Sequence, residues 1–265
     1  EDSFTLPETM PYKLALAMSI LEGASSNFAH FLLVCLPQIS MLKTTQYADI
    51  PILVDADTHI NFYRLIYMIH PSANLIRVPL DVSVEVKNLI YITPISEFPF
   101  ETDKTHNSCN FSSSGLKAVL ADFELAHPRN IIKRPGMNKY FLQRGSYYRN
   151  ILNENEVESA LLKEGYLILN PSELSVQEQI NIYREADIII SPSGATLANL
   201  IHCKKTAKIH ILYSDSDLLD LSMWVNLSNA TSKACILVHT FPASDRNYMH
   251  SDFTVNVEDL IACLE

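Results

Sequence analysis

A glycine-containing turn near residue 194 is the first place in this chain where the backbone itself could bind an anion. The turn Pro192-Ser193-Gly194 follows an apolar stretch at 187–191, which predicts a buried strand, and precedes a helix expected at 195–203. A residue without Cβ lets backbone N–H groups approach a ligand closely, and the first N–H groups of a helix lack carbonyl partners within it. The turn therefore predicts a phosphate site. A tight turn that merely favours glycine is the alternative, because the full G-x-G-x-x-G pattern is missing.

Two arginines, Arg144 and Arg149, could bring positive charge to the same anion. Arg144 stands at the end of a strand predicted at 140–144. Ligands of open α/β sheets bind beyond the carboxyl ends of the strands, and a guanidinium group can bind phosphate oxygens through two parallel hydrogen bonds. The pair therefore predicts contact with a diphosphate, and two ordinary surface arginines are the alternative.

The pair Asp55 and Asp57 could instead hold a divalent cation. The two residues follow an apolar strand predicted at 52–55, and carboxylates are typical ligands of Mg²⁺. Against a metal site, the same D-x-D spacing recurs at 215–217, and Asp57 or Thr58 would serve as the N-cap of a helix beginning near residue 59. We therefore favour the cap and expect no metal ion and no other cofactor.

Alternating strands and helices position these residues. The first half predicts strands at 14–20, 52–55, 75–78 and 89–93, and helices at 28–43, 59–69 and 116–126. The second half predicts strands at 140–144, 166–169, 187–191, 208–213 and 235–239. Its helices are expected at 154–163 with Asn153 as N-cap, from Ser172 or Ser175 to about 185, and at 195–203, 217–227 and 260–264. This alternation is typical of an α/β protein with mostly parallel sheets.

A stretch with two prolines and three basic residues, at 127–136, separates two α/β patterns. We therefore expect two domains, an N-terminal lobe at 1–134 and a C-terminal lobe at 135–265. The chain has 265 residues, of which 48% are hydrophobic, so it is long enough to bury a sizeable core in each lobe.

Charge and composition narrow the classes of partner. The formal net charge of −10 argues against a nucleic-acid partner, and no apolar run reaches the roughly 18 residues of a transmembrane helix. The five cysteines are scattered and odd in number, which argues against a disulfide framework and favours a reducing compartment. We expect a cytoplasmic protein, free or peripheral to the inner membrane, with the lumen of the Golgi or the endoplasmic reticulum as the alternative.

Three stretches, taken together, resemble glycosyltransferase family 61. Residues 140–158, YFLQRGSYYRNILNENEVE, are similar to the R…R-x-I-x-N-E-x-E segment of that family. Residues 174–203, LSVQEQINIYREADIIISPSGATLANLIHC, are similar to its L-S-x-x-E-Q…A-x-x-I-I-G-P-H-G-A-x-L-x-N segment. Residues 27–39, NFAHFLLVCLPQI, resemble its N-Y-x-H-W-L…L-P-R segment. The resemblance is strongest at 140–203 and weak at 44–136.

The resemblance implies a GT-B-like arrangement, in which two Rossmann-like lobes with mostly parallel sheets enclose the active site in an interlobe cleft. It also implies an inverting, metal-independent transfer of a hexosyl or pentosyl group from a nucleotide sugar to a glycan or glycoconjugate acceptor. Carried over by position, Arg144 and Arg149 would face the donor diphosphate. The donor would also contact the turn at Ser193, Gly194 and Ala195.

The acceptor side of the implied cleft would be lined by Asn27 and His30. An inverting transfer needs a general base, and His30 is the first candidate because its ordinary pKa lies near neutrality. Glu22 and the pair Asp55 and Asp57 are the competing carboxylates. A histidine that only fixes the start of a helix is the structural alternative for His30.

The chain departs from the family pattern at Ser193, where the family usually has histidine, and at Ser191, where it has glycine. A serine hydroxyl can donate a hydrogen bond to an oxyanion but cannot carry a positive charge. This departure keeps a second function open, a non-catalytic nucleotide- or sugar-binding lobe of a larger polysaccharide-biosynthesis protein. A dehydrogenase is disfavoured by the missing G-x-G-x-x-G. Motif matches at Asn153, Glu154 and Gln179 are expected to be structural.

Overall fold

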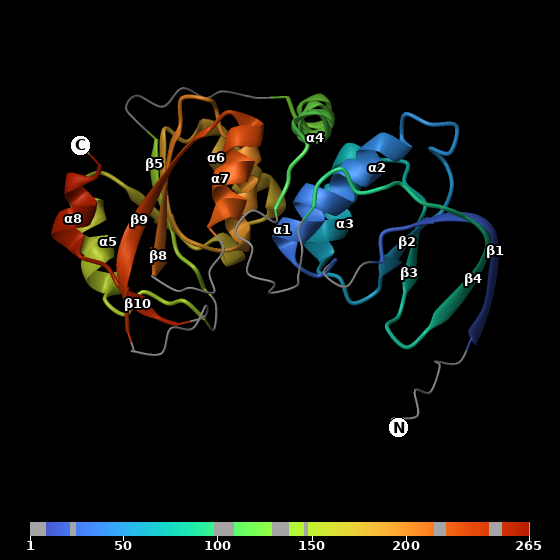
Figure 1. The fold of residues 1–265 in the computed structure, drawn as a ribbon, viewed down its shortest axis with the longest axis horizontal. Coiled ribbons are helices and arrows are strands. Elements are labelled where there is room, and N and C mark those ends of the chain that lie inside the picture. The colour runs from blue at the N-terminus through green and yellow to red at the C-terminus, as the bar shows by residue number, and fades with distance from the viewer. Residues whose placement is uncertain are drawn as a thin grey trace. The chain divides into compact units, whose positions relative to one another are not determined.

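The computed structural model describes residues 9–21, 25–97, 109–128, 138–145, 148–214, 221–243 and 251–264, and these form two compact units (Figure 1). The first unit comprises Glu1–Ser96 and Ser114–Pro128, and the second comprises Glu97–Ser113 and Arg129–Glu265. The expected boundary between residues 134 and 135 lies outside the described residues. Each unit is built on one mostly parallel sheet, so the expected α/β class is confirmed.

The first unit contains a four-stranded parallel sheet in the order β3-β2-β1-β4. Its strands are β1 (Thr9–Ser19), β2 (Ile52–Asp55), β3 (Leu75–Val78) and β4 (Ser83–Ile90). Its helices are α1 (Phe28–His30), the π-helical turn η1 (Phe31–Cys35), α2 (Leu36–Leu42), α3 (Ile60–Ile69) and α4 (Ser113–Ala126). The predicted strand at 89–93 is therefore wrong in its position. As an edge strand, β4 exposes polar residues such as Glu85 and Lys87, and these conceal its apolar signal.

Hydrogen bonds explain why the stretch 97–113 belongs to the second unit although α4 belongs to the first. The Asn226 side chain donates to the carbonyl oxygen of Cys109 at 2.8 Å, and the Ser113 hydroxyl donates to the carbonyl oxygen of Ala230. The α4 side chain Asp122 instead accepts from Ser40 at 2.6 Å and pairs with Lys43 at 2.7 Å, both on the first unit.

The second unit contains a six-stranded sheet in the order β10-β9-β8-β7-β5-β6. Its strands are β5 (Lys139–Leu142), β6 (Leu167–Leu169), β7 (Ile188–Pro192), β8 (Lys208–Ser214), β9 (Ala234–Pro242) and the antiparallel β10 (Phe253–Thr254). Its helical elements are α5 (Glu154–Lys163), η2 (Pro171–Glu173), α6 (Val176–Glu185), η3 (Ala195–His202), α7 (Ser222–Thr231) and α8 (Val257–Ala262). The short strand β10 was not among the expected elements.

The order of these strands creates a switch point between β5 and β7. From β5 the chain passes through α5 to β6, and it returns through α6 to β7 on the other side of β5. Figure 1 shows α5 and α8 on one face of the sheet and α6 and α7 on the other. Where successive crossovers take opposite faces, the carboxyl ends of the two neighbouring strands border a crevice, and ligands of α/β sheets bind there.

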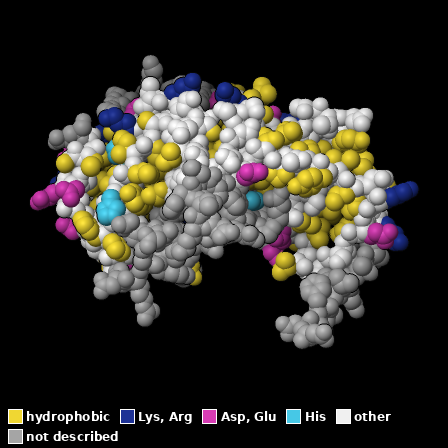
Figure 2. All heavy atoms as spheres, in the orientation of Figure 1, with side chains coloured by type: hydrophobic (Ala, Val, Ile, Leu, Met, Phe, Trp, Pro, Cys, Tyr) yellow, Lys and Arg dark blue, Asp and Glu magenta, His cyan; other side chains and the backbone are white. Residues whose placement is uncertain are grey.

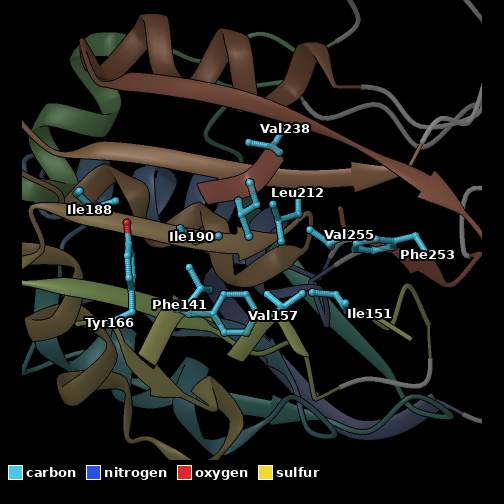
Figure 3. Close-up of a cluster of buried hydrophobic side chains, with 12 residues drawn as sticks. Phe141, Ile151, Val157, Tyr166, Ile188, Ile190, Leu212, Val238, Phe253 and Val255 are labelled. Carbon is cyan, nitrogen blue, oxygen red and sulfur yellow. The ribbon is translucent and has the colours of Figure 1, made fainter. Parts of the chain in front are cut away.

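A continuous apolar core holds β5 and β7 in place (Figure 3). Phe141, Ile190 and Leu212 come from three adjacent parallel strands, and Val157 of α5 packs against them. All four side chains are fully buried. Fully burying one such side chain contributes about 1.5–3 kcal/mol, so the strand ends at the switch point are firmly fixed.

Two helix starts in the second unit differ in how they form. Ser175 caps α6 as expected, since its hydroxyl accepts from the N–H of Glu178 at 3.3 Å while its own N–H donates to the Glu178 carboxylate at 2.8 Å. The helix expected after Gly194 is a 3₁₀ helix rather than an α-helix. The expected start of α7 near residue 217 lies outside the described residues, and the described helix begins at Ser222.

Within the described part of the chain, no helix combines the length and the apolar composition that a membrane span requires. Figure 2 shows one face of the molecule, on which the described Lys and Arg side chains lie in separate small groups near the edges of the view. This distribution agrees with the acidic composition of the chain, whose formal net charge is −10.

Gln179 of α6 connects three segments of the second unit. Its amide nitrogen donates to the carbonyl oxygens of Pro171 at 2.9 Å and Leu174 at 3.3 Å. Its amide oxygen accepts from the buried side chain of Asn199 in η3 at 3.2 Å. Gln179 and Asn199 therefore hold η3, and with it the turn at Gly194, against α6.

We predict that Gln179→Ala lowers the free energy of unfolding by about 1–3 kcal/mol, because it leaves a buried Asn199 donor without its acceptor. Denaturant unfolding measures the change. Asn181→Ala, which removes only a contact from an exposed side chain of α6 to Gln177, is the control and should change stability by less than about 0.5 kcal/mol. If the two variants lower the free energy of unfolding equally, the hydrogen bonds of Gln179 do not contribute more than a surface contact.

Candidate functional site

Arg144 bridges the carboxyl ends of the two strands that border the switch point. It stands two residues after the end of β5, and β7 ends at Pro192 beside it. Its guanidinium Nη1 donates to the carbonyl oxygen of Ser193, and its Nε donates to the carbonyl oxygen of Tyr148 at 2.7 Å. The guanidinium plane is therefore fixed between the turn after β7 and the loop after β5.

Gly194 makes room for that guanidinium. Its backbone is extended, with φ −177° and ψ 167°, a conformation that any residue can adopt. A methyl group built on its Cα would overlap Nη1 of Arg144 and lie 3.3 Å from its Cζ. The glycine is thus required by the close approach of Arg144 rather than by backbone strain.

The first turn of η3 offers backbone donors next to Arg144. The N–H of Ser193 donates to the carbonyl oxygen of Leu212 in β8 at 2.8 Å and is therefore already bonded. The first hydrogen bond of η3 runs from the N–H of Leu197 to the carbonyl oxygen of Gly194 at 3.0 Å. Among the described residues, no carbonyl accepts from the N–H groups of Ala195 or Thr196. Free N–H groups at the start of a helix are suited to bind an anion.

Arg149 adds a second, uncompensated positive charge. Its Nε is buried without a hydrogen-bond partner, and no carboxylate among the described residues pairs with it. Burial lowers the pKa of Arg149, and burial together with the charge of Arg149 lowers the pKa of Arg144 to about 10. The backbone of Arg149 is left-handed, with φ 58°, which is costly for a residue with a Cβ. The chain thus holds two guanidinium groups close together although they repel each other.

Ser193 turns its side chain away from solvent. The residue is 3% exposed, and its hydroxyl oxygen accepts from the indole N–H of Trp224 in α7 at 3.0 Å. No local sequence pattern predicted this contact, because Trp224 lies 31 positions further along the chain in another helix. At the second departure from the family pattern, Ser191 donates its hydroxyl to the carbonyl oxygen of Pro192 at 3.1 Å.

The expected acceptor-side residues lie in the first unit. Asn27 caps α1, since its side-chain oxygen accepts from the N–H groups of Ala29 at 2.9 Å and His30 at 3.2 Å. His30 is 5% exposed. Glu22 lies outside the described residues. A shared role of Asn27 and His30 with the arginines of the second unit stays a prediction.

The D-x-D pair shapes a turn after β2. The N–H of Asp57 donates to the Asp55 carboxylate at 2.9 Å. His59 is the N-cap of α3, because its Nδ1 accepts from the N–H of Asn61 at 3.2 Å. The expectation of Asp57 or Thr58 as cap is therefore wrong, since the turn closed by Asp55 delays the helix start. Among the described residues, no group of three or more His, Cys, Asp or Glu side chains is placed to hold a metal ion.

We predict that Gly194→Ala folds but weakens anion binding about tenfold or more, because the added methyl group displaces Arg144 from a charge-assisted hydrogen-bonding position. Calorimetric titration with pyrophosphate measures the affinity.

Gly165→Ala is the control for that substitution. Gly165 has φ 81° and open space around it, so its replacement should cost about 1–2 kcal/mol of stability and leave affinity unchanged. Native affinity in folded Gly194→Ala would mean that the position of Arg144 does not matter for the anion.

Comparison with known proteins identifies the family of this chain. The family described as Glycosyltransferase 61 matches residues 28–210, a span that contains the switch point, both arginines and the turn at Gly194. No curated protein matches the chain. Among solved structures, the chain is similar to the bacterial iron-containing dodecameric glycosyltransferase TibC from enterotoxigenic E. coli H10407. The sequence identity is 10%, the TM-score is 0.42, and the match covers 76% of this chain and 58% of TibC, less than two thirds of that protein. Because the family match extends over more than half of its residues, this chain belongs to glycosyltransferase family 61.

Proposed function

We propose that the protein transfers a hexosyl or pentosyl group, with inversion, from a nucleotide sugar to a glycan or glycoconjugate acceptor. In this proposal the donor diphosphate lies at the carboxyl ends of β5 and β7. Arg144 and Arg149 neutralise its charge, and the N–H groups of the first turn of η3 donate to its oxygens. Family membership supports the transferase activity, and the geometry of the switch point supports the position of the donor.

The charge of Arg149, which no carboxylate among the described residues compensates, is the observation that carries the proposal. A buried guanidinium nitrogen without an acceptor costs stability, and a left-handed backbone at the same residue adds to that cost. A diphosphate would supply the missing acceptors and relieve the repulsion between the two arginines. Such a site is matched to a ligand with two or more negative charges rather than to a neutral sugar.

The acceptor hydroxyl has to lose its proton during the transfer. His30 is our first candidate for the general base, with Glu22 and the pair Asp55 and Asp57 as competitors, and Asn27 would orient the acceptor. We also propose a cytoplasmic location, because nucleotide sugars made by soluble enzymes are then directly available to the site.

A non-catalytic donor-binding lobe is the second candidate function. Its specific support is Ser193, a buried neutral residue at the position where the family usually has histidine. Hydrolysis of nucleotide sugars by the purified chain separates the two, since a catalytic chain releases free sugar slowly even without acceptor. If the chain binds nucleotide sugars tightly but releases no free sugar from any of a wide panel of donors, the non-catalytic binding lobe is favoured.

We predict that Arg149→Gln weakens the binding of pyrophosphate by about 1.5–3 kcal/mol, the range for hydrogen bonds to charged groups. In the ligand-free protein the same substitution should not lower the melting temperature, because it removes a repulsive charge.

Calorimetric titration and thermal unfolding measure the two effects. Lys205→Gln, which removes one exposed positive charge, is the control and should change neither quantity. Binding of native strength in Arg149→Gln would place the diphosphate elsewhere.

We predict that transfer needs no divalent metal, because arginines can neutralise the diphosphate in place of a cation. Activity should persist in excess chelator, and the double substitution of Asp55 and Asp57 to Asn should retain donor binding. If chelation abolishes transfer and Mn²⁺ restores it, the metal-independent mechanism is wrong.

A further inference from the structure

Trp224 pairs with Ser193 next to the turn of the proposed donor site but has no role in that site as proposed above. Trp224 is the only tryptophan of the chain, and it is 4% exposed on α7. Its indole N–H donates to the hydroxyl oxygen of Ser193 at 3.0 Å, and both side chains are buried. An indole nitrogen can only donate, so this bond has one possible direction.

That direction determines what the serine hydroxyl can do. With its oxygen accepting from Trp224, the hydroxyl retains one proton to donate. Among the described residues, no acceptor takes that proton, although the residue is 3% exposed. A buried donor without an acceptor costs about 1–3 kcal/mol, and a ligand that brings an acceptor would remove this cost.

The backbone of the same residue locates that ligand. The carbonyl oxygen of Ser193 accepts from Arg144, and the next residue, Gly194, packs against the guanidinium. An anion bound by Arg144 and by the first turn of η3 would therefore lie beside the backbone of Ser193. A phosphate oxygen is the kind of acceptor that can take the remaining hydroxyl proton.

We propose that Trp224 is a positioning residue that orients the Ser193 hydroxyl as a hydrogen-bond donor to the donor diphosphate. The indole N–H occupies the oxygen lone pair that would otherwise compete, and it increases the polarity of the remaining O–H bond. The two residues thus supply a neutral donor at the position where the family usually has histidine. This inference rests on the proposed function, because it requires an anion at the switch point.

The single tryptophan allows a direct spectroscopic test. A ¹⁵N-labelled chain gives one indole N–H resonance, which needs no assignment, and inorganic pyrophosphate is the first probe, followed by uridine and guanosine diphosphates. We expect this resonance to shift as pyrophosphate saturates the site, because the hydroxyl that accepts from the indole becomes a donor itself. Calorimetry on the same samples gives the affinity.

Substitutions assign the shift to Ser193. In Ser193→Ala, we expect the resonance to move in the free protein and to stop responding to pyrophosphate, with affinity lowered about tenfold or more. Ser193→Thr keeps the hydroxyl and should retain the response. Trp224→Phe, measured by calorimetry, should bind pyrophosphate several-fold more weakly, and it serves as the second variant if Ser193→Ala does not fold.

The outcomes separate this inference from the proposed function. If Arg149→Gln weakens binding but Ser193→Ala and Trp224→Phe bind with native affinity, the diphosphate site stands and the role of Ser193 and Trp224 is wrong. An indole resonance that stays fixed while calorimetry shows saturation overturns the inference in the same way. If the native chain binds neither pyrophosphate nor a nucleoside diphosphate, both proposals fail.

Discussion

The hydrogen bond from Arg144 to the carbonyl oxygen of Ser193 joins the two strands on which the rest of the site depends. It forms at the point where the chain reverses the order of its strands, so that β5 and β7 become neighbours while α5 and α6 lie on opposite faces of the sheet. This divergence leaves the carboxyl ends of the two strands uncovered by either helix layer. Gly194 completes the junction, because any side chain there would displace the guanidinium.

The pairing of charged side chains differs between the amino and carboxyl ends of the neighbouring strands β5 and β7. At the amino end, Asp187 pairs with Lys204 and also accepts from the backbone N–H of Asn138 at 2.8 Å, so that both charges are satisfied within the chain. Beyond the carboxyl end of the neighbouring strand β5, the second guanidinium, Arg149, has a buried nitrogen with no acceptor among the described residues. Unpaired buried charge lowers stability, and proteins retain such costs mainly at sites where a ligand removes them. The contrast between the amino and carboxyl ends of these two parallel strands therefore supports a functional role for the carboxyl ends.

The serine in place of the usual histidine changes the kind of interaction available rather than removing it. An imidazole could carry charge or exchange a proton, whereas a hydroxyl that accepts from Trp224 can only donate a neutral hydrogen bond. Among the described residues after β5 and β7, Arg144 and Arg149 then supply the positive charge at the switch point. Arginine keeps its charge over the whole physiological pH range, even with the pKa of Arg144 lowered to about 10.

The sequence by itself determined the elements with clear patterns and the residue types that bind an anion. Alternating apolar runs predicted β2, β3 and α5 with their exact bounds, and Ser175 was one of the two serines predicted to cap α6. The edge strand β4 was misplaced, because local polarity does not distinguish an edge strand from a loop. Only the tertiary structure decided that Gly194 accommodates Arg144, that the Nε of Arg149 is buried without an acceptor among the described residues, and that Trp224 reaches Ser193. These facts depend on contacts between residues that lie far apart along the chain. The order of the strands and the packing of the helices fix such contacts, and neither leaves a local pattern in the sequence.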